Sequence, residues 1–187
     1  MLVLTRHEKS VIAEWKKFGV LQDIEEHLLD QANGAILVTC SDADQFGEVF
    51  RHQCNLQISH RPEPRVHTFA WHGGALACAP CSPVNKRKHA HLVFLDQVSD
   101  ARILKDIHVV VSRIHAPCGA ARMNAVEIEE EMAIHIRAKQ QIKNLNQGIV
   151  VACFFDVDYG DGKKRTLFVS REKWEMWAEQ HGIPSIA

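Results

Sequence analysis

The stretch Ile107 to Met123, IHVVVSRIHAPCGAARM, decides how the rest of this chain is interpreted. Its β-branched residues run without polar alternation toward His115, which predicts a strand buried on both faces. Pro117 and Gly119 then indicate a tight turn and the start of a helix. His115 and Cys118 therefore lie just past a strand end, and imidazole and thiolate are both ligands that zinc accepts.

A second stretch, Ala35 to Asp44, repeats this arrangement, because AILVTCSDAD is an apolar strand that ends in Cys40 and Asp42. In open α/β sheets the ligand site lies beyond the carboxyl ends of the strands, so the two stretches are expected to converge. Together they supply two thiolates, an imidazole and a carboxylate, a set that suits zinc. The alternative is a pair of buried cysteines and a hydrogen-bonded core histidine.

Composition narrows the class of protein. The chain has 187 residues, of which 46% are hydrophobic and 24% charged, and its net charge is -1. These values are typical of one globular domain and argue against nucleic-acid or membrane-surface binding. The start, MLVLTRHEKS, has no long apolar core and so predicts no secretory signal. Six cysteines without such a signal favour the reducing cytoplasm, with metal or core roles for the thiols.

Apolar periodicity predicts helices that alternate with strands. We expect helices at 8–31, 46–56, 86–105, 119–147 and 171–180, and strands at 35–39, 65–71, 107–114, 149–157 and 165–169. Within the helix at 86–105 the residues expected to face inward are Leu92, Leu95, Val98, Ile103 and Leu104. The alternation predicts an α/β fold with a mostly parallel central sheet of about five strands, the last two forming an antiparallel hairpin, and helices on both faces.

We interpret residues 1–187 as a single domain. It divides into an N-terminal helical arm at 1–34, an α/β core at 35–170 and a C-terminal helix at 171–187. The amphipathic arm has no obvious place on a small sheet, which favours packing on a second chain.

At this point a family resemblance becomes specific. The pattern C-x-D at the first strand end and H-x-x-C-G at the third resembles the β-class carbonic anhydrases. Gln31 lies nine residues before Cys40, as a pocket glutamine does in that family. The segment IVVACFFDVDYGDGKKRTLFV is similar to the family's fourth strand, hairpin and fifth strand, so the resemblance spans roughly residues 20 to 170.

The resemblance implies a site and an assembly. It implies zinc held by Cys40, His115 and Cys118, a parallel sheet with a terminal antiparallel strand, and Gln31 in the active-site pocket. It also implies a homodimer, or a higher homo-oligomer, whose N-terminal helices pack on the partner. The substrate it implies is a small molecule, carbon dioxide or bicarbonate.

The chain departs from the family pattern at two places. The family reads C-x-D-x-R, whereas Asp44 occupies the arginine position here. In the family that arginine pairs with the aspartate and holds it away from the metal. The family's Arg-Asn-Ala-Gly stretch is also changed, to Trp71-His72-Gly73-Gly74.

The first departure predicts a closed metal shell. A carboxylate near zinc coordinates the ion unless another group competes, and Asp44 adds a second negative charge instead of a competitor. Asp42 is therefore expected to become the fourth ligand, which leaves no position for water. Another arginine would restore the pairing if it reached Asp42, and Arg51, Arg113 and Arg122 are the candidates by proximity in the sequence.

Three further features have an ordinary and a functional interpretation. His72 follows a strand end and is a candidate proton acceptor or extra ligand, against the alternative of a solvated histidine. Cys78 and Cys81 have redox-motif spacing but lack the usual following helix pattern, which favours ordinary thiols. The run Glu127 to Glu131 is interpreted as an exposed helix face.

Three functions remain open from the sequence. The first is a zinc lyase that hydrates carbon dioxide, with Asp42, Asp44, Gln31 and His72 as candidate catalytic residues. The second is a zinc enzyme of the same fold acting on another small substrate. The third is a non-catalytic zinc-binding protein. The family resemblance favours the first, whereas Asp44 favours the other two.

Overall fold

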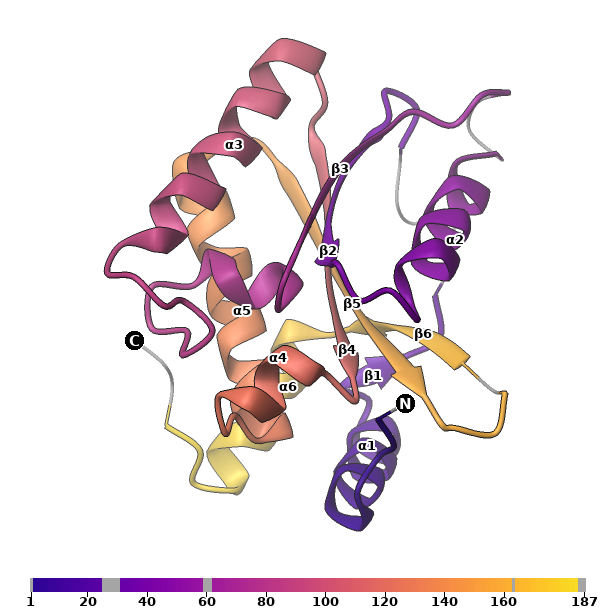
Figure 1. The fold of residues 1–187 in the computed structure, drawn as a ribbon, viewed down its shortest axis with the longest axis vertical. Helices are drawn as coiled ribbons and strands as arrows, with labels where there is room; N and C mark the ends of the chain where they lie inside the picture. The colour runs from indigo at the N-terminus through magenta and orange to yellow at the C-terminus, as the bar shows by residue number, and fades with distance from the viewer. Residues whose placement is uncertain (1, 25–30, 59–61, 163, 185–187) are drawn as a thin grey trace.

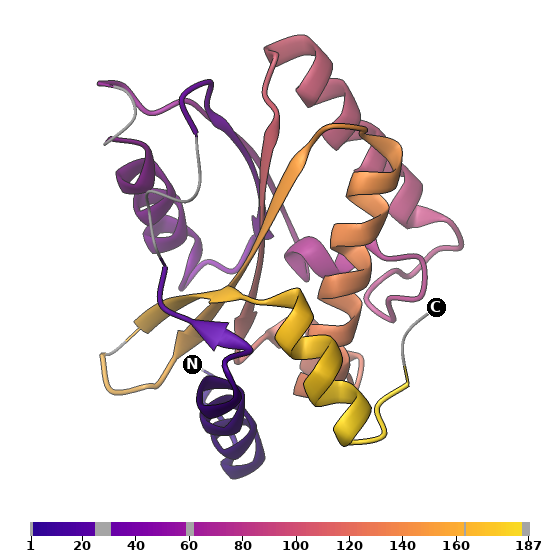
Figure 2. The same ribbon diagram turned by 180° about the vertical axis from the view of Figure 1, so that it is seen from behind.

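Six strands form one sheet between two layers of helices (Figures 1 and 2). The structure, a computed structural model, describes residues 2–24, 31–58, 62–162 and 164–184. The strands are β1 (Leu21–Gln22), β2 (Ala35–Cys40), β3 (Val66–Trp71), β4 (Val109–Ala116), β5 (Val150–Asp158) and β6 (Lys164–Val169). The helices are α1 (Arg6–Phe18), α2 (Phe46–Ile58), α3 (Ala90–Lys105), α4 (Gly119–Met123), α5 (Ile128–Leu145) and α6 (Arg171–Gln180), and a short 3-10 helix, η2 (Gly74–Cys78), follows β3.

The strand order is β1-β6-β5-β4-β2-β3. Strands β3, β2, β4 and β5 run parallel, whereas β6 is antiparallel to β5, and β1 to β6. Helix α2 covers one face, and α3 and α5 cover the other (Figure 1). The predicted α/β fold, with a mostly parallel sheet and an antiparallel terminal strand, is confirmed, with one strand more than the five expected.

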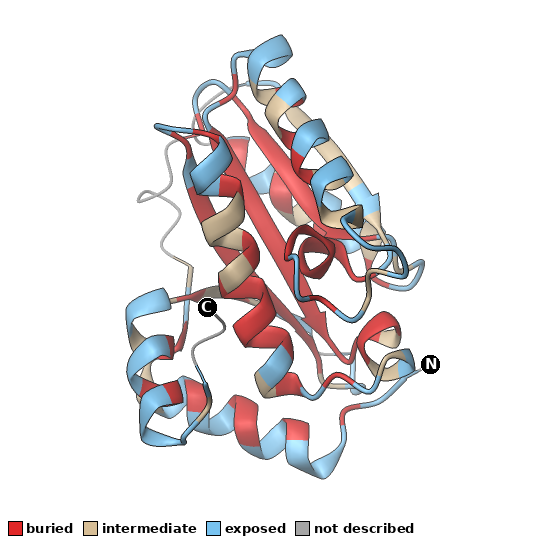
Figure 3. Ribbon diagram, turned by 90° about the vertical axis from the view of Figure 1, so that its left-hand side faces the viewer, coloured by how far each residue is buried: buried red, intermediate tan, exposed pale blue. Residues whose placement is uncertain are grey.

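The central strands form the core of the molecule. Every residue of β2 and β4 is buried, and Figure 3 shows these strands between more exposed helices. Successive residues of β4 face opposite sides, so Val110 joins the large cluster beneath α3 and α5, while Val111 joins a smaller cluster with Val49 of α2. Burial on both faces explains why these strands show no polar alternation in the sequence.

The helix predicted at 8–31 is wrong in its second part. Helix α1 ends at Phe18, because Gly19 adopts a left-handed backbone conformation with φ of 86° and donates its N–H to the helix. Leu21 and Gln22 then pair with β6 and form the additional strand β1. The part of this prediction at residues 25–30 lies outside the described residues.

The long helix predicted at 119–147 is two helices, α4 and α5. Ala125, in the segment between them, has a φ of 53°, which no continuous right-handed helix allows. Helix α5 has 18 residues and carries charged side chains along its length. Across the described ranges, no helix is both long enough and apolar enough to cross a membrane.

Helix α3 begins at Ala90 rather than at residue 86 and does not face inward as predicted. Leu95 and Val98 are buried, but Leu92, Ile103 and Leu104 are 45%, 71% and 77% exposed. The buried stripe of α3 instead consists of Leu95, Val98 and Ala101 at three-residue steps, on the side that faces the sheet (Figure 1).

Helix α1 has a place on its own chain, which the sequence did not reveal, and its packing on a partner stays a prediction. Trp15 is fully buried, and its ring makes edge-to-face contacts with Phe155, Trp174 and Trp177 at centroid distances of 6.0, 5.6 and 5.7 Å. Thr5 and Glu8 cap the start of the helix with reciprocal hydrogen bonds. The apolar face of the arm is therefore covered by α6 and the sheet, and it does not require a second chain.

A glycine brings η2 against the ends of the two central strands. A Cβ at Gly74 would lie 2.5 Å from the Cys40 nitrogen and 3.1 Å from the Arg113 carbonyl oxygen. The φ of Gly74 is also positive, at 53°. Trp71 Nε1 donates a hydrogen bond to the Gly74 carbonyl at 2.5 Å and so holds the turn. Only glycine fits this position, and the backbone of residue 40 depends on it.

We expect Gly74→Ala to lower the free energy of unfolding by about 3 kcal/mol, because left-handed strain and overpacking add. Gly148→Ala is the matched control: Gly148 has a φ of 77° with no atom within 4 Å of an added Cβ. It should lose only about 1 kcal/mol. Urea unfolding of the two variants measures the difference, and equal losses would show that the close packing at Cys40 contributes nothing.

Candidate metal centre

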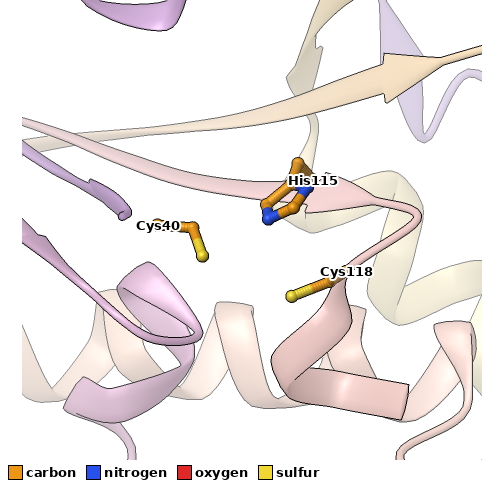
Figure 4. Close-up of side chains that lie close together, drawn as sticks. All are labelled: Cys40, His115 and Cys118. Atoms are coloured by element: carbon orange, nitrogen blue, oxygen red, sulfur yellow. The ribbon is translucent and has the colours of Figure 1, made fainter. Parts of the chain in front are cut away.

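Three side chains with metal-ligating atoms converge at the carboxyl ends of β2 and β4. Cys40 is the last residue of β2, His115 is the next-to-last residue of β4, and Cys118 is the N-cap of α4. Their ligand atoms all lie within 4.8 Å of one another, and all three residues are buried (Figure 4). The strands are parallel neighbours, with Ile36 opposite Val110, so their ends meet at one edge.

The thiols of Cys40 and Cys118 influence each other through a hydrogen bond. A hydrogen bond from Cys118, supported by His115 and the Gly73 N–H, lowers the pKa of Cys40 to about 4, although burial acts in the opposite direction. The same hydrogen bond, together with burial, raises the pKa of Cys118. These opposite shifts favour the thiolate at Cys40 and the protonated thiol at Cys118. A metal ion that binds here must displace the remaining proton.

The surroundings of His115 suit a metal ligand. Burial lowers its pKa, but the nearby Cys40 sulfur and its negative charge outweigh burial and raise it overall. Both ring nitrogens are buried, and neither meets the full geometry of a hydrogen bond to any described residue. Buried polar atoms nearly always have a partner, so an imidazole with none needs explanation. Two sulfur donors and one free imidazole nitrogen, in a cluster this tight, fit zinc.

Asp42 lies near this cluster but is bonded to its own turn. Its Oδ1 accepts a hydrogen bond from the Asp44 N–H at 2.9 Å, and its side chain is not among the three gathered within 4.8 Å. Its negative charge nevertheless contributes to the raised pKa of His115. The second carboxylate oxygen of Asp42 remains available, so its role as a fourth ligand stays a prediction.

The arginine that would hold Asp42 away from a metal is missing. Each of the three candidates bonds to another group: Arg51 to the Gly47 carbonyl, Arg113 to the Asp156 carboxylate, and Arg122 to Glu8 and the Val3 carbonyl. Within the described ranges none of the three makes a hydrogen bond or ion pair with Asp42. Among the described residues, therefore, none of the three candidate arginines pairs with Asp42 in place of the family's arginine.

Lys164 hydrogen-bonds to the loop that carries Asp42 and Asp44. Its Nζ donates to the Asp44 carbonyl at 3.1 Å and forms ion pairs with Glu48 at 3.0 Å and Asp158 at 3.6 Å. Two carboxylates thus surround one ammonium group, and they raise its pKa despite the opposing effect of partial burial. Lys164 is held by these groups and does not replace the missing arginine at Asp42.

The structure does not bring Gln31 or His72 to the cluster. Gln31 precedes the start of β2, whereas Cys40 is its last residue. The two are therefore separated within one chain by at least the length of the strand, about 17 Å. Its Oε1 accepts hydrogen bonds from Gln53 at 2.5 Å and Gln57 at 3.2 Å. His72 is exposed. Their catalytic roles stay predictions.

Cys78 and Cys81 differ in their surroundings. Both are free; Cys78 is buried, and burial raises the pKa of its thiol to about 12, whereas Cys81 is exposed. A thiol with a raised pKa is a poor nucleophile, which fits the ordinary interpretation of this pair.

Sequence reasoning missed two groups beside the cluster. The Gly73 N–H donates to Cys40, and the glycine doublet after β3 was the only signal for it. Glu131, expected on an exposed helix face, is only 3% exposed, and its Oε2 has no hydrogen-bond partner. Burial raises the pKa of Glu131, and its charge in turn contributes to the raised pKa of Cys118. No local pattern distinguishes it from its exposed neighbours.

No protein-family model matches this sequence, and no curated protein matches it significantly. Solved structures with a similar chain path do exist. A carbonic anhydrase from Streptococcus mutans is 12% identical, with 89% of this chain and 99% of that chain covered and a TM-score of 0.43. The β-carbonic anhydrase CafA of Aspergillus fumigatus is 14% identical, with coverage of 93% and 94% and a TM-score of 0.39. A structure from a study of two tetrameric β-carbonic anhydrases of Sordaria macrospora is 13% identical, with coverage of 86% and 94% and a TM-score of 0.40.

These structures are carbonic anhydrases, the family that the C-x-D and H-x-x-C-G patterns resemble. Identities of 12 to 14% and TM-scores below 0.5 carry no argument about what this chain does. Its function has to be argued from its own residues.

We expect about one zinc ion per chain, because three donors already converge. Zinc at a thousandfold excess over its dissociation constant should raise the melting temperature by about 10 °C. Cys118→Ala should lose both the metal and this response, whereas Cys81→Ala, at an exposed thiol, should keep both. Elemental analysis and thermal unfolding check this, and a metal-free chain that melts at the same temperature with and without zinc would contradict it.

Proposed function

We propose that this chain is a β-carbonic-anhydrase-like zinc protein with weakened or lost carbonate dehydratase activity. The observation that carries the proposal is the convergence of Cys40, His115 and Cys118, with both nitrogens of His115 buried and unpartnered. Zinc in such a site acts as a Lewis acid toward water, the chemistry by which carbonic anhydrases hydrate carbon dioxide. The residues of this chain would hold the ion, and the aspartates beside it would set how accessible it is.

The weakening follows from Asp42 and Asp44. Without an arginine partner, the free oxygen of Asp42 is available to the metal, and a fourth protein ligand leaves no open position. Asp44 adds a second negative charge within two residues, which disfavours the approach of bicarbonate. We therefore propose Asp42 as the fourth ligand and Asp44 as the residue that leaves it unrestrained.

Asp44→Arg should raise the rate of carbon dioxide hydration by about tenfold or more, an effect of about 1.4 kcal/mol on the barrier. The new guanidinium would pair with Asp42 and withdraw it from the metal, as the family's arginine does. Stopped-flow hydration measurements on the native chain and the variant test this.

Two further proteins make that assay decisive. Asp44→Lys supplies the charge without the bidentate geometry and should recover less than arginine does. Cys118→Ala, which lacks a ligand, sets the background rate. A native rate that already reaches that of an efficient enzyme would show that Asp42 does not block the site.

We further propose that the chain assembles as a homodimer through the free edge of β3. This strand is the last in the sheet, and within the described residues its outer side pairs with no other strand. His67, Phe69 and Trp71 form a half-exposed aromatic row along it, with successive centroid distances of 4.9 and 5.6 Å. An exposed edge of this kind favours pairing with another strand.

A twofold dimer of this form would give Gln31 a role. Antiparallel pairing of β3 with its copy places the start of β2 from one chain at the same edge as the end of β2 from the other. Gln31 of a second chain would then lie on the side of the first chain's Cys40. This arrangement is compatible with a pocket glutamine that is distant from Cys40 within its own chain.

Light scattering should give a dimer, or a multiple of it, at micromolar concentration. Ala70→Pro tests the edge: the Trp71 carbonyl bonds toward β2, so the Ala70 N–H points outward and its loss spares the sheet. The variant should become monomeric and keep its zinc content. A monomeric native chain, or a dimer that Ala70→Pro leaves intact, would contradict this assembly.

We propose the cytoplasm as the location of the chain. All six cysteines are free, and two of them are required as metal ligands. Oxidation of that pair would remove the site, so a reducing compartment suits it.

A further inference from the structure

The N-terminal segment Leu2–Leu4 lies across the turn that carries Cys118. A Cβ at Gly119 would be 3.5 Å from Leu2 Cδ1, and one at Gly160 would be 3.8 Å from Val3 Cγ1. The segment therefore bridges the ligand-bearing turn and the hairpin between β5 and β6. Leu4, which is 5% exposed, anchors it in the core.

Arg122 ties this segment to the metal-binding turn. Four residues after Cys118, its Nη2 donates to the Val3 carbonyl at 2.6 Å and to Glu8 Oε2 at 2.9 Å. Glu8 in turn accepts from the Thr5 N–H at 2.5 Å. One guanidinium thus holds both the segment before α1 and the first turn of α1, so the position of Leu2 is specified by hydrogen bonds rather than by apolar contact alone.

A small acidic cavity lies beneath Leu2. Its volume is about 70 Å³, and it is lined by Leu2, Asp42, Asp44, Gln45, Pro117 and Asp158. Cavities that bind drug-sized ligands are about 300–1,000 Å³, so this one holds only a few non-hydrogen atoms. Asp42 and Pro117 are each within two residues of a cysteine of the cluster, so the cavity lies beside the candidate centre.

The charge at this mouth is negative. Asp42, Asp44 and Asp158 contribute three carboxylates to the wall. Lys164 offsets part of this charge, but it is shared with Glu48 outside the cavity. Negative charges that face a narrow, partly buried opening repel anions more strongly than the same charges in open solvent.

We propose that Leu2–Leu4 forms a strap over the mouth of the Cys40–His115–Cys118 centre, and that the strap and the carboxylates admit small neutral or cationic ligands in preference to anions. The inference rests on the proposed function in that it names which ligands reach the same site most easily. Neutral carbon dioxide enters easily, whereas the passage of bicarbonate is slowed. The strap makes Leu2 a specificity-determining residue.

Methanethiosulfonate reagents test access to Cys40 without relying on catalysis. The thiolate attacks the divalent sulfur of the reagent, the reagent's S–S bond breaks, a mixed disulfide forms and methanesulfinate leaves. The same chemistry can therefore carry neutral, anionic or cationic groups. The background is the full chain with Cys54→Ser and Cys81→Ser, which removes the half-buried and the exposed thiols. Mass spectrometry of peptides identifies the modified cysteine, in protein as isolated and after treatment with a chelator.

The neutral methyl and the cationic ammonium-ethyl reagents should modify Cys40 about tenfold faster than the anionic sulfonate-ethyl reagent. Leu2→Ala should speed all three reagents by a similar factor, because it removes the strap and leaves the charge unchanged. Asp42→Asn with Asp44→Asn should speed the anionic reagent alone. Val93→Ala, at a residue that is 57% exposed on α3, is the control and should change no rate.

Several outcomes would overturn the proposal. If Cys40 reacted equally fast with all three reagents, the carboxylates would not control access. If Leu2→Ala reacted no faster than the background protein, Leu2 would not cover the mouth. Arg122→Gln provides a second test of the strap and should increase access in the same way as Leu2→Ala. A failure of the proposed function would give another result. The chain would bind no zinc, but the reagent rates would still depend on reagent charge and on Leu2.

Discussion

Parallel pairing of β2 with β4 is the constraint on which the rest of this structure depends. Cys40 and His115 are 75 positions apart in the sequence and meet only because both strands end at the same edge of the sheet. Gly74 packs so closely on the end of β2 that an added Cβ would lie 2.5 Å from the Cys40 nitrogen. This packing helps to fix the position of Cys40. Cys118 follows His115 by one turn, so it needs no further long-range contact to join them.

Buried polar groups show which contacts in this region are satisfied and which are not. Arg113 and Asp156 form a bidentate pair on the α2 side, and Thr166 donates a further hydrogen bond to the carboxylate, so the charges of that buried pair are well compensated. Two residues further along the same strand, neither ring nitrogen of His115 meets the full geometry of a hydrogen bond to any described residue. The Arg113–Asp156 network is fully hydrogen-bonded, so the buried imidazole without such bonds stands out in this region.

Much of this arrangement could be predicted from local sequence. The unbroken apolar runs before Cys40 and His115 identify buried strands, and the strand-end rule then places the two residues together. What local sequence could not supply were contacts formed between distant positions. Arg122 bonds to Glu8, 114 residues away, and no pattern around either residue encodes that pair. Glu131 was expected to be exposed because it ends a run of glutamates, and nothing within that run signals that this one side chain is buried.

The charges around the candidate centre affect binding and reactivity in opposite directions. Two thiolates, an imidazole and the Asp42 carboxylate would leave a zinc site with a net charge of about -1, and Asp44 and Asp158 add to the negative field. Such a field strengthens the retention of a dication, because Coulomb attraction is large in a partly buried site. It also weakens the Lewis acidity that the ion can offer to water, because anionic ligands donate charge to it. An arginine at position 44 would reverse both effects. An aspartate rather than an arginine at position 44 and the proposed strap would therefore act together: they would favour a metal that is held tightly and exposed little over one that is poised for rapid turnover.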